Sequence, residues 1–279
     1  MSLEFSARVA RLILVIAISG LVAGCGDSAS TTGSQEVAQR SGGTPSESPK
    51  TISPPSGRLV FQPRFLFADE NITHQGTGFF VADSKGKVLG VTSAHFIDFE
   101  GPPMVSAAWI AFPEFEAVTE FEYSYGAPGD EGTLEPIDLR RDYLIVAGEK
   151  NATEVTPLEL DERKVIDENE RVWLPNKDQN TTEGHTLVEG TVVEASKEYV
   201  TVILDEEITL QSQSGSPLIS QQTGKVIGTL SRGGNSDGST VLFLCPARSI
   251  LDAIEKEPSL VPLRKAIGKP EKSQAAEDS

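Results

Sequence analysis

The chain has 279 residues, and its 24 Lys and Arg against 41 Asp and Glu give a formal net charge of −17. Such an acidic chain argues against nucleic acid as a partner, because neutralising phosphates requires clustered Lys and Arg. Only two cysteines are present, so a folded domain of about 200 residues must rest on its apolar core rather than on disulfides.

The first 25 residues predict an exported lipoprotein. Two arginines precede the apolar run 12–18, and small residues precede Cys25. This order is typical of a signal peptide, and the run is shorter than the about 20 residues of a membrane span. We expect Cys25 to become the lipidated N-terminus and to anchor the chain to a membrane outside the cytoplasm, in the periplasm or at the cell surface. An ordinary secretory signal, or a short uncleaved anchor, is the alternative.

Polar segments are expected on both sides of the folded domain. Residues 26–57 are rich in Ser, Thr, Gly and Pro, which favours a disordered tether. Residues 263–279 are expected to form a polar tail, so the folded domain should span 58–262. With Cys25 lipidated, Cys245 has no partner within the chain and should behave as a small buried side chain.

The sequence of the domain predicts a succession of short strands. Apolar runs bounded by Gly, Pro, Asp and Asn occur at 58–67, 76–82, 87–94, 104–112, 117–123, 142–147, 171–174, 186–195, 199–204, 216–220, 225–231 and 240–245. Many short strands with turn signals indicate an all-β sandwich or barrels. One helix is expected at 247–256, after Pro246. A break near 151–157 separates two halves, at about 58–150 and 155–246.

Three residues in this chain order have the types required for nucleophilic catalysis. His95 follows an apolar run and two small residues, and Asp142 precedes the apolar run 143–147. Ser214 lies in a Ser-Gly-Ser-Pro turn. A serine hydroxyl becomes a useful nucleophile when an imidazole takes its proton and a shielded carboxylate orients that imidazole. We therefore predict that His95 and Asp142 from the first half meet Ser214 from the second.

Each assignment has a less specific alternative. Histidines are often surface or core residues, an interpretation that suits His74 and His185. Asp138 is the rival carboxylate, although it lies further from the apolar run than Asp142. A Ser-Gly-Ser-Pro segment alone is also compatible with a plain turn, since Gly and Ser are common in loops.

Together these motifs resemble the trypsin-like (chymotrypsin-fold) serine peptidases, over about residues 58–260. The resemblance implies two six-stranded antiparallel β-barrels with a cleft between them and a short C-terminal helix. It also implies that the backbone N–H groups of Ser212 and Ser214 form the oxyanion hole, the donor pair that stabilises the developing negative charge. Ser231 would hydrogen-bond Asp142, and Arg232 and Gly233 would pair with the substrate backbone.

This chain departs from the family at three positions. Ser212 stands where the family has glycine, and serine resists unusual backbone dihedrals. Gln213 replaces the aspartate that pairs with a newly cut N-terminus in trypsin-type zymogens, so activation by clipping is not expected. Ile208, at the expected base of the specificity pocket, offers no carboxylate to a basic side chain.

The expected function is therefore that of a lipid-anchored serine endopeptidase that hydrolyses peptide bonds in proteins or peptides. We expect it to require no cofactor or metal and to be a monomer. The alternative is a catalytically weak domain that binds peptides or a protein partner at the cell surface, an interpretation that Ser212 keeps open. An esterase of the α/β-hydrolase type is disfavoured, because that fold orders its catalytic residues Ser, Asp, His.

Overall fold

The computed structural model describes residues 52–130, 132–150, 152, 155–236, 238–256 and 259–269. The expected signal peptide, Cys25, most of the tether and the end of the tail lie outside these residues. The described residues belong to one compact unit, 51–279. None of the helices described in it is long and apolar enough to cross a membrane.

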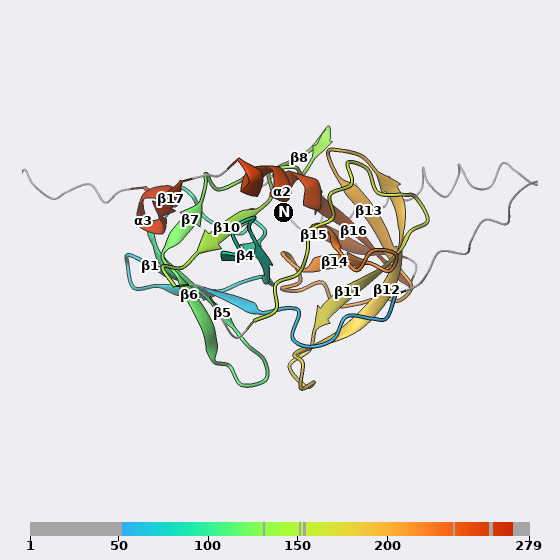
Figure 1. The fold of residues 1–279 in the computed structure, drawn as a ribbon, viewed down its shortest axis with the longest axis horizontal. Helices are drawn as coiled ribbons and strands as arrows, with labels where there is room; N and C mark the ends of the chain where they lie inside the picture. Colours follow the sequence, from blue (N-terminus) through green and yellow to red (C-terminus); the bar gives the residue numbers. More distant parts are fainter. Residues whose placement is uncertain are drawn as a thin grey trace, which may run out of the picture. The chain divides into compact units, whose positions relative to one another are not determined.

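The first half of this unit contains two antiparallel sheets (Figure 1). Their strands are β1 (Gln62–Phe67), β2 (Ile72–His74), β3 (Phe79–Ala82), β4 (Val88–Thr92), β5 (Met104–Ile110), β6 (Ala117–Phe121), β7 (Tyr123–Tyr125), β10 (Leu144–Ala147) and β17 (Leu260–Pro262). The four-stranded sheet has the order β2-β1-β5-β6, and the five-stranded sheet has the order β17-β7-β10-β4-β3. A separate hairpin pairs β8 (Thr133–Leu134) with β9 (Ile137–Asp138).

The two sheets share an aromatic core. The buried ring of Trp109 on β5 packs edge-on against Phe121, with ring centroids 4.9 Å apart, and its N–H donates to the carbonyl oxygen of Phe79 at 3.2 Å. Gly90 on β4 makes room for these rings, since a Cβ there would lie 2.7 Å from Phe121. Truncating a buried aromatic residue to alanine typically costs about 3–5 kcal/mol. Strands β4 and β10 therefore rest on a rigid base.

The second half is a closed barrel of six antiparallel strands. These are β11 (Arg171–Lys177), β12 (His185–Ala195), β13 (Val200–Leu204), β14 (Pro217–Ser220), β15 (Val226–Ser236) and β16 (Ser239–Pro246), in the order β11-β12-β13-β16-β15-β14. Pairing of β14 with β11 closes the barrel. Its interior is filled by aliphatic side chains, among them Val172, Leu174, Val202, Leu218 and Leu242. Closure leaves few open edges where another strand could add.

A further cluster of buried apolar residues joins the two halves to the helix α2 (Ala247–Glu255). It contains Val91 and Ile145 from the first half and Trp173 and Ile219 from the second. The helix follows Pro246, and its buried residues Ala247, Ile250 and Ile254 recur every three or four positions, which places them on one face. Cys245 is fully buried in the same cluster, as expected of a small apolar side chain.

The ordered chain extends beyond both expected limits of the domain. β17 pairs with β7, and the short helix α3 (Leu263–Ala266) follows it. Leu263 and Ile267 are fully buried in the core of the first half, so residues 263–267 are not part of a polar tail. At the other end, the N–H of Ile52 donates to the Gln221 carbonyl oxygen at 3.2 Å. These apolar residues are too few and too isolated to form a recognisable period in the sequence.

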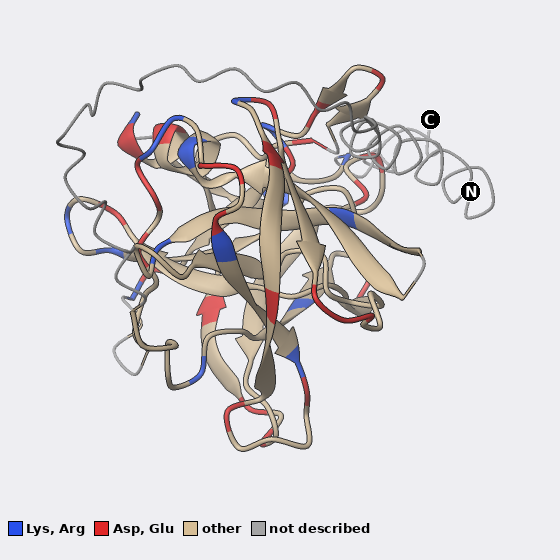
Figure 2. Cartoon of the chain, turned by 90° about the vertical axis from the view of Figure 1, so that its right-hand side faces the viewer, with Lys and Arg blue, Asp and Glu red and all other residues tan. Residues whose placement is uncertain are grey.

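The expected all-β class with a short C-terminal helix is confirmed. The second half forms the expected six-stranded barrel, while the first half is divided into its two sheets, linked by an isolated bridge between Phe61 and Gly78. In the view of Figure 2, Lys and Arg positions are scattered among Asp and Glu positions over several strands and loops. Interspersed charges of this kind favour solubility rather than binding to a polyanion.

Candidate active site

The carboxylate of Asp142 is the centre of a buried hydrogen-bond network. It lies in the turn before β10 and is fully buried. Its Oδ1 accepts hydrogen bonds from the N–H groups of Ala94, at 2.8 Å, and His95, at 2.9 Å. Its Oδ2 accepts one from Nδ1 of His95 at 2.8 Å and one from the Ser231 hydroxyl. In the part of the chain that the structure describes, four donors and no Lys or Arg therefore satisfy this buried charge.

His95 reaches Asp142 because their strands are neighbours. β4 pairs with β10 through Thr92 and Leu144, so the residues after β4 lie beside the turn before β10. The ring of His95 packs edge-on against Phe96 with centroids 5.4 Å apart, and its side chain remains 20% exposed. Because Nδ1 donates to a carboxylate, a neutral ring keeps Nε2 as an acceptor on its accessible side.

Ser214 is held by contacts with both halves of the molecule. Its carbonyl oxygen accepts a hydrogen bond from the Thr77 N–H at 2.7 Å, and the N–H of Gly215 donates to Leu230 at 2.7 Å. Gly215 has φ 91°, and a Cβ there would lie 2.0 Å from the Thr77 carbonyl oxygen. Only glycine fits this turn without rearrangement. The nucleophile candidate thus sits where the two halves meet.

The Ser214 hydroxyl donates to the carbonyl oxygen of Ser231 at 3.4 Å. Among the described residues, no hydrogen bond joins this hydroxyl to His95. The His95 imidazole is therefore hydrogen-bonded directly to the Asp142 carboxylate. The Ser214 hydroxyl is connected to this pair through Ser231, whose carbonyl oxygen accepts from Ser214 and whose hydroxyl donates to Asp142. A bulge between Leu230 and Arg232 places Ser231 outside the β15–β16 pairing, and bulges typically redirect a side chain in this way.

Ser212 occupies a turn that favours glycine. The N–H of Gln213 donates to the Leu210 carbonyl oxygen at 3.1 Å, and Ser212, the third residue of this turn, has φ 62°. A positive φ at the third position is the mark of a type II turn. The Ser212 carbonyl oxygen accepts hydrogen bonds from the Thr77 hydroxyl at 2.8 Å and from Nζ of Lys177 at 3.3 Å. Within the described chain, the N–H groups of Ser212 and Ser214 donate no hydrogen bond.

Gln213 anchors the same loop through neutral hydrogen bonds. Its side chain is 4% exposed, and its Nε2 donates to the side-chain oxygen of Asn176 at 2.7 Å. Its Oε1 accepts hydrogen bonds from the Ser216 hydroxyl at 3.3 Å and from the Lys177 N–H at 3.4 Å. These contacts hold the nucleophile loop on the end of β11 with no charged partner for Gln213.

The substrate-binding candidates lie on and beside β15. Arg232 and Gly233 pair with Phe243 and Leu242 of β16, which leaves the other edge of this part of β15 without a described partner strand. Ile208 is buried within the apolar core of the second half, where its side chain supplies no charge.

Gly233 also shows how close the apolar wall behind this edge is. A Cβ at Gly233 would lie 3.0 Å from Leu242 and 3.1 Å from Leu210. Leu210, which sequence reasoning did not single out, therefore contributes to this wall together with Ile208.

The less specific alternatives take ordinary structural places. Asp138 forms an ion pair with Arg140 at 2.5 Å, outside the Asp142 network. His74 is exposed on β2. His185 is buried with its Nδ1 3.1 Å from the Glu183 carbonyl oxygen, and burial lowers its pKa. In the described ranges, no group of three or more His, Cys, Asp and Glu side chains is placed to hold a metal ion.

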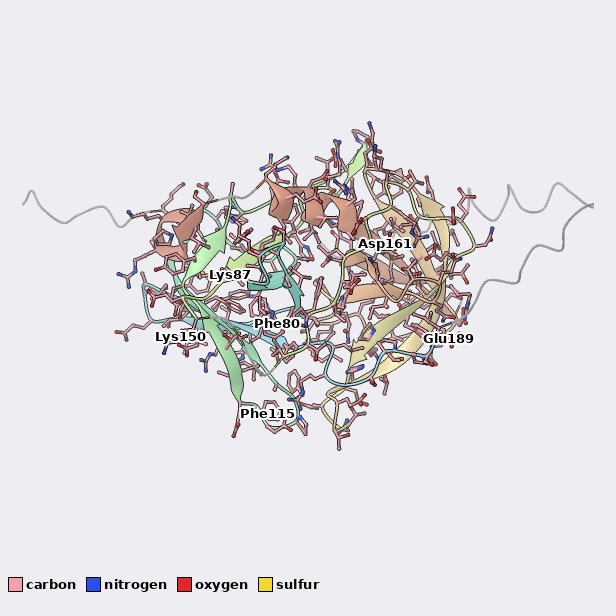
Figure 3. The ribbon with its side chains drawn as sticks, viewed as in Figure 1. Phe80, Lys87, Phe115, Lys150, Asp161 and Glu189 are labelled. Atoms are coloured by element: carbon pink, nitrogen blue, oxygen red, sulfur yellow. The ribbon has the colours of Figure 1, made fainter. Side chains whose placement is uncertain are left out.

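A groove borders the Ser212 turn on the side of the first half. Residues that line it include Phe112, Phe115, Lys177, Gln211 and Ser212. Phe115, labelled in Figure 3, is 62% exposed, and its ring packs edge-on against Phe112. Lys177 and Thr77 were missed by sequence reasoning, because a lysine ending a strand and a threonine between glycines carry no distinctive pattern.

Residues 76–228, more than half of the chain, match the family described as trypsin-like peptidase domain. The chain belongs to this family. Trypsin-like peptidases are hydrolases that act on proteins, and the matched residues include His95, Asp142 and Ser214. The comparison with curated proteins found no match.

Several solved structures are similar to this trypsin-like peptidase domain. A serine endoprotease from Yersinia pestis has 16% identity and a TM-score of 0.48, covering 74% of this chain and 67% of that chain. Kallikrein-related peptidase 10 has 17% identity and a TM-score of 0.47, with 70% and 94% covered. Tobacco etch virus protease complexed with product has 15% identity and a TM-score of 0.48, with 76% and 85% covered.

Proposed function

We propose that this trypsin-like peptidase is a lipid-anchored serine endopeptidase that works outside the cytoplasm and uses His95, Asp142 and Ser214. The observation that carries the proposal is the buried Asp142 carboxylate. Its hydrogen bonds reach the His95 imidazole on one side and, on the other, Ser231, which is the hydrogen-bond partner of Ser214. Anchoring through Cys25 is supported by the sequence pattern alone.

In the proposed reaction, Ser214 Oγ bonds to the carbonyl carbon of the substrate while its proton passes to Nε2 of His95. Asp142 holds His95 through Nδ1 and stabilises the imidazolium. The C–N bond of the intermediate then breaks as His95 gives the proton to the leaving amine. A water molecule, losing a proton to His95, attacks the resulting ester, and release of the acid returns the proton to Ser214.

The N–H groups of Ser212 and Ser214 are proposed to bind the oxyanion that forms in both steps. Their having no hydrogen bond within the described chain supports this role, because an oxyanion donor must be available to the reacting oxygen. Losing one such donor typically costs about a hundredfold to a thousandfold in turnover.

Catalysis also requires the Ser214 hydroxyl to turn from the Ser231 carbonyl oxygen toward Nε2 of His95. The present bond, at 3.4 Å, lies beyond the usual range of hydroxyl hydrogen bonds, so it is a weak competitor. Hydrogen bonds between catalytic groups are often long without substrate and shorten when it binds.

The second candidate is a catalytically weak domain that binds a peptide or a protein partner. The orientation of the Ser214 hydroxyl, toward Ser231 rather than His95, favours it. In that function the edge of β15 at Arg232 and Gly233 would hold an extended peptide as an added strand, and the peptide would leave uncleaved.

A fluorophosphonate probe distinguishes the two candidates. The full-length chain is incubated with the probe beside Ser214→Ala and, as a matched control, Ser84→Ala, which removes an exposed loop hydroxyl. The peptidase proposal expects covalent labelling of the unaltered chain and of Ser84→Ala but not of Ser214→Ala. Equal labelling of all three, or none in any, contradicts it.

The anchor needs a separate test. The full-length chain and Cys25→Ala are expressed in a bacterial host supplied with a clickable fatty acid. Fatty-acid incorporation and membrane sedimentation are expected only with Cys25. Incorporation that survives Cys25→Ala, or none in either chain, would remove lipid anchoring from the proposal without affecting the catalytic part.

A further inference from the structure

Lys177 connects the two halves at the Ser212 turn. It ends β11 of the second half, and its Nζ donates to the carbonyl oxygen of Gly76, in the first half, at 3.0 Å. The same ammonium lies 3.3 Å from the Ser212 carbonyl oxygen and 5.8 Å from the centroid of the Phe112 ring. One half-buried side chain thus contacts the turn, the segment before β3 and an aromatic ring.

No carboxylate pairs with the Lys177 ammonium among the described residues. Opposite it on β12 is His185, and next to it is Asp178, whose carboxylate accepts hydrogen bonds from Asn180 at 2.8 and 2.9 Å. On the first-half loop that carries Phe112, Glu114 pairs with Arg58 at 2.8 Å. Withdrawing part of an ammonium from water with only carbonyl oxygens as partners is costly, which makes a purely stabilising role a poor explanation.

The two segments whose carbonyl oxygens contact Lys177 add no acidic or basic side chain. The segment 75–77 leads from β2 to β3 and carries no titratable side chain, while the turn 210–213 carries none either.

Ser212 adopts a backbone conformation that is unfavourable for a residue with a side chain. A glycine adopts a positive φ freely, but a serine at φ 62° sits in a region that disfavours side chains. The alternative is a type I turn with a negative φ at the third position. That change turns over the peptide between Gln211 and Ser212, and it moves the Ser212 N–H away from the reacting oxygen.

We infer that Lys177 is a positioning residue for the reaction, an inference that rests on the proposed peptidase function. Its ammonium and the Thr77 hydroxyl hold the Ser212 carbonyl oxygen. These bonds fix the position of Ser212, the residue about which the 211–212 peptide would turn, and so help to retain the turn in which the Ser212 N–H faces the oxyanion. Asn176, the preceding residue, holds Gln213 in the same loop. Lys177 and Asn176, at the end of β11, thus stabilise the loop before Ser214. In other members of the family, a glycine at the position of Ser212, or an ion pair between a new N-terminus and the residue at the position of Gln213, is expected to stabilise it.

The pH dependence of the site follows from the same contacts. Burial lowers the pKa of Lys177 to about 8. Below that pH the ammonium donates charge-assisted hydrogen bonds, and above it the neutral amine donates weaker ones. The rate should therefore fall on the alkaline side in the unaltered chain.

The test measures the second-order rate of fluorophosphonate labelling from pH 6 to 10 in the full-length chain. Attack by Ser214 forms the O–P bond and expels fluoride, and the phosphonyl oxygen takes the place of the carbonyl oxygen, so the rate reports on the oxyanion hole. Lys177→Met keeps the apolar stem and should lower the rate about tenfold to a hundredfold at pH 7. It should also abolish the alkaline fall.

Ser212→Gly supplies the decisive readout, because glycine needs no clamp. Lys177→Met combined with Ser212→Gly should label within about threefold of Ser212→Gly alone, since coupled residues give non-additive effects. Lys87→Met is the matched control: Lys87 also donates to a backbone carbonyl, of Gly148 at 3.0 Å, but lies in the first half beside β4 (Figure 3). Its rate and pH profile should equal those of the unaltered chain.

Should Lys177→Met fail to fold by circular dichroism, Thr77→Val removes the other hydrogen bond to the Ser212 carbonyl. It should lower the rate by about threefold to tenfold and should also be rescued by Ser212→Gly. An unaltered rate and alkaline limb in either folded variant, or a loss that Ser212→Gly does not reverse, overturns the inference alone. Absence of labelling in the unaltered chain overturns the proposed function and the inference together.

Discussion

Two buried acidic clusters in this molecule are satisfied in different ways. Asp161 and Glu170 are 3% and 1% exposed, and the guanidinium of Arg163 lies 2.7 Å from the first and 2.8 Å from the second. Asp142 is equally buried, yet its partners are two backbone N–H groups, a hydroxyl and an imidazole.

The difference separates a structural cluster from a chemical one. Burial alone would raise the pKa of Asp161, but hydrogen bonds from Arg163 hold that pKa below its ordinary value. A guanidinium is permanently charged, so Arg163 gives both carboxylates a partner that neither gains nor loses a proton. The donors around Asp142 include an imidazole, the side chain that most often transfers protons in catalysis, so this cluster is equipped for a reaction.

The largest expected effect tests the chemical cluster. Asp142→Asn keeps the size of the side chain but removes the charge, and its amide stabilises the wrong imidazole tautomer. We expect the labelling rate to fall about ten-thousandfold, as is typical of this substitution in a serine triad. The rate is measured with the fluorophosphonate probe below the melting temperature. A fall of less than tenfold would show that Asp142, like Asp161, has a structural role and not a catalytic one.

The matched experiment breaks the structural cluster. Arg163→Met leaves two buried carboxylates without a cation, and removing one partner of a buried ion pair costs about 3–5 kcal/mol. We expect this loss in urea unfolding, with an unchanged labelling rate where the variant is folded. A folded variant that loses labelling would show that the Arg163 cluster also contributes to the reaction, which contradicts its assignment as purely structural.

The pH dependence of stability sharpens the same experiment. The depressed pKa of Asp161 means that its contribution is present above the unfolded pKa, near 3.9, and is lost as the pH falls through the lower folded value. The unaltered chain should therefore lose stability below about pH 4. Arg163→Met should show a shallower loss over that range, measured as melting temperature against pH.

Lys177 provides a third case, a half-buried cation that has no carboxylate partner among the described residues. Its pKa is lowered to about 8, so between that pH and about 10 the unfolded chain binds more protons and stability rises with pH. At pH 7 the lowered pKa corresponds to a cost of about 1–3 kcal/mol, at 1.36 kcal/mol per pKa unit and reduced because the side chain is partly exposed to solvent. Lys177→Met should thus be about 1–2 kcal/mol more stable at pH 7. A less stable variant would assign Lys177 to the scaffold.

A further prediction concerns the Ser231 hydroxyl. Ser231→Ala removes the hydroxyl that donates to Asp142 but keeps the carbonyl oxygen that accepts from Ser214. Loss of one hydrogen bond to a charged group is worth about 1.5–3 kcal/mol, so we expect the labelling rate to fall about tenfold to a hundredfold. Ser84→Ala, on an exposed loop, serves as the reference. An unchanged rate would reduce the cluster to His95 and Asp142.

Local patterns in the sequence were enough to predict the antiparallel strands, the helix after Pro246 and the three candidate residues. His95 and Asp142 each adjoin an apolar run that became β4 or β10, and pairing of these strands was enough to bring them together. The strand period and turn residues carry that information locally.

Long-range contacts could not be predicted in the same way. The burial of Leu263 and Ile267 and the contact of Lys177 with Gly76 depend on segments about 100 or more residues apart. The division of the first half into two sheets depends on pairings between strands that are not neighbours in the chain, such as β1 with β5 and β4 with β10. Likewise, the sequence predicted that Ser212 would resist an unusual backbone, but not that Thr77 and Lys177 would hold its carbonyl oxygen.

The most direct test of the account locates the covalent bond. The full-length chain is labelled with the fluorophosphonate probe, digested and analysed by tandem mass spectrometry. We expect a single phosphonate adduct on Ser214 in the unaltered chain, and its loss when His95 is changed to Ala. An adduct on another residue, or an adduct on Ser214 that forms equally fast without the His95 imidazole, would contradict the claim that Asp142 and His95 activate this serine.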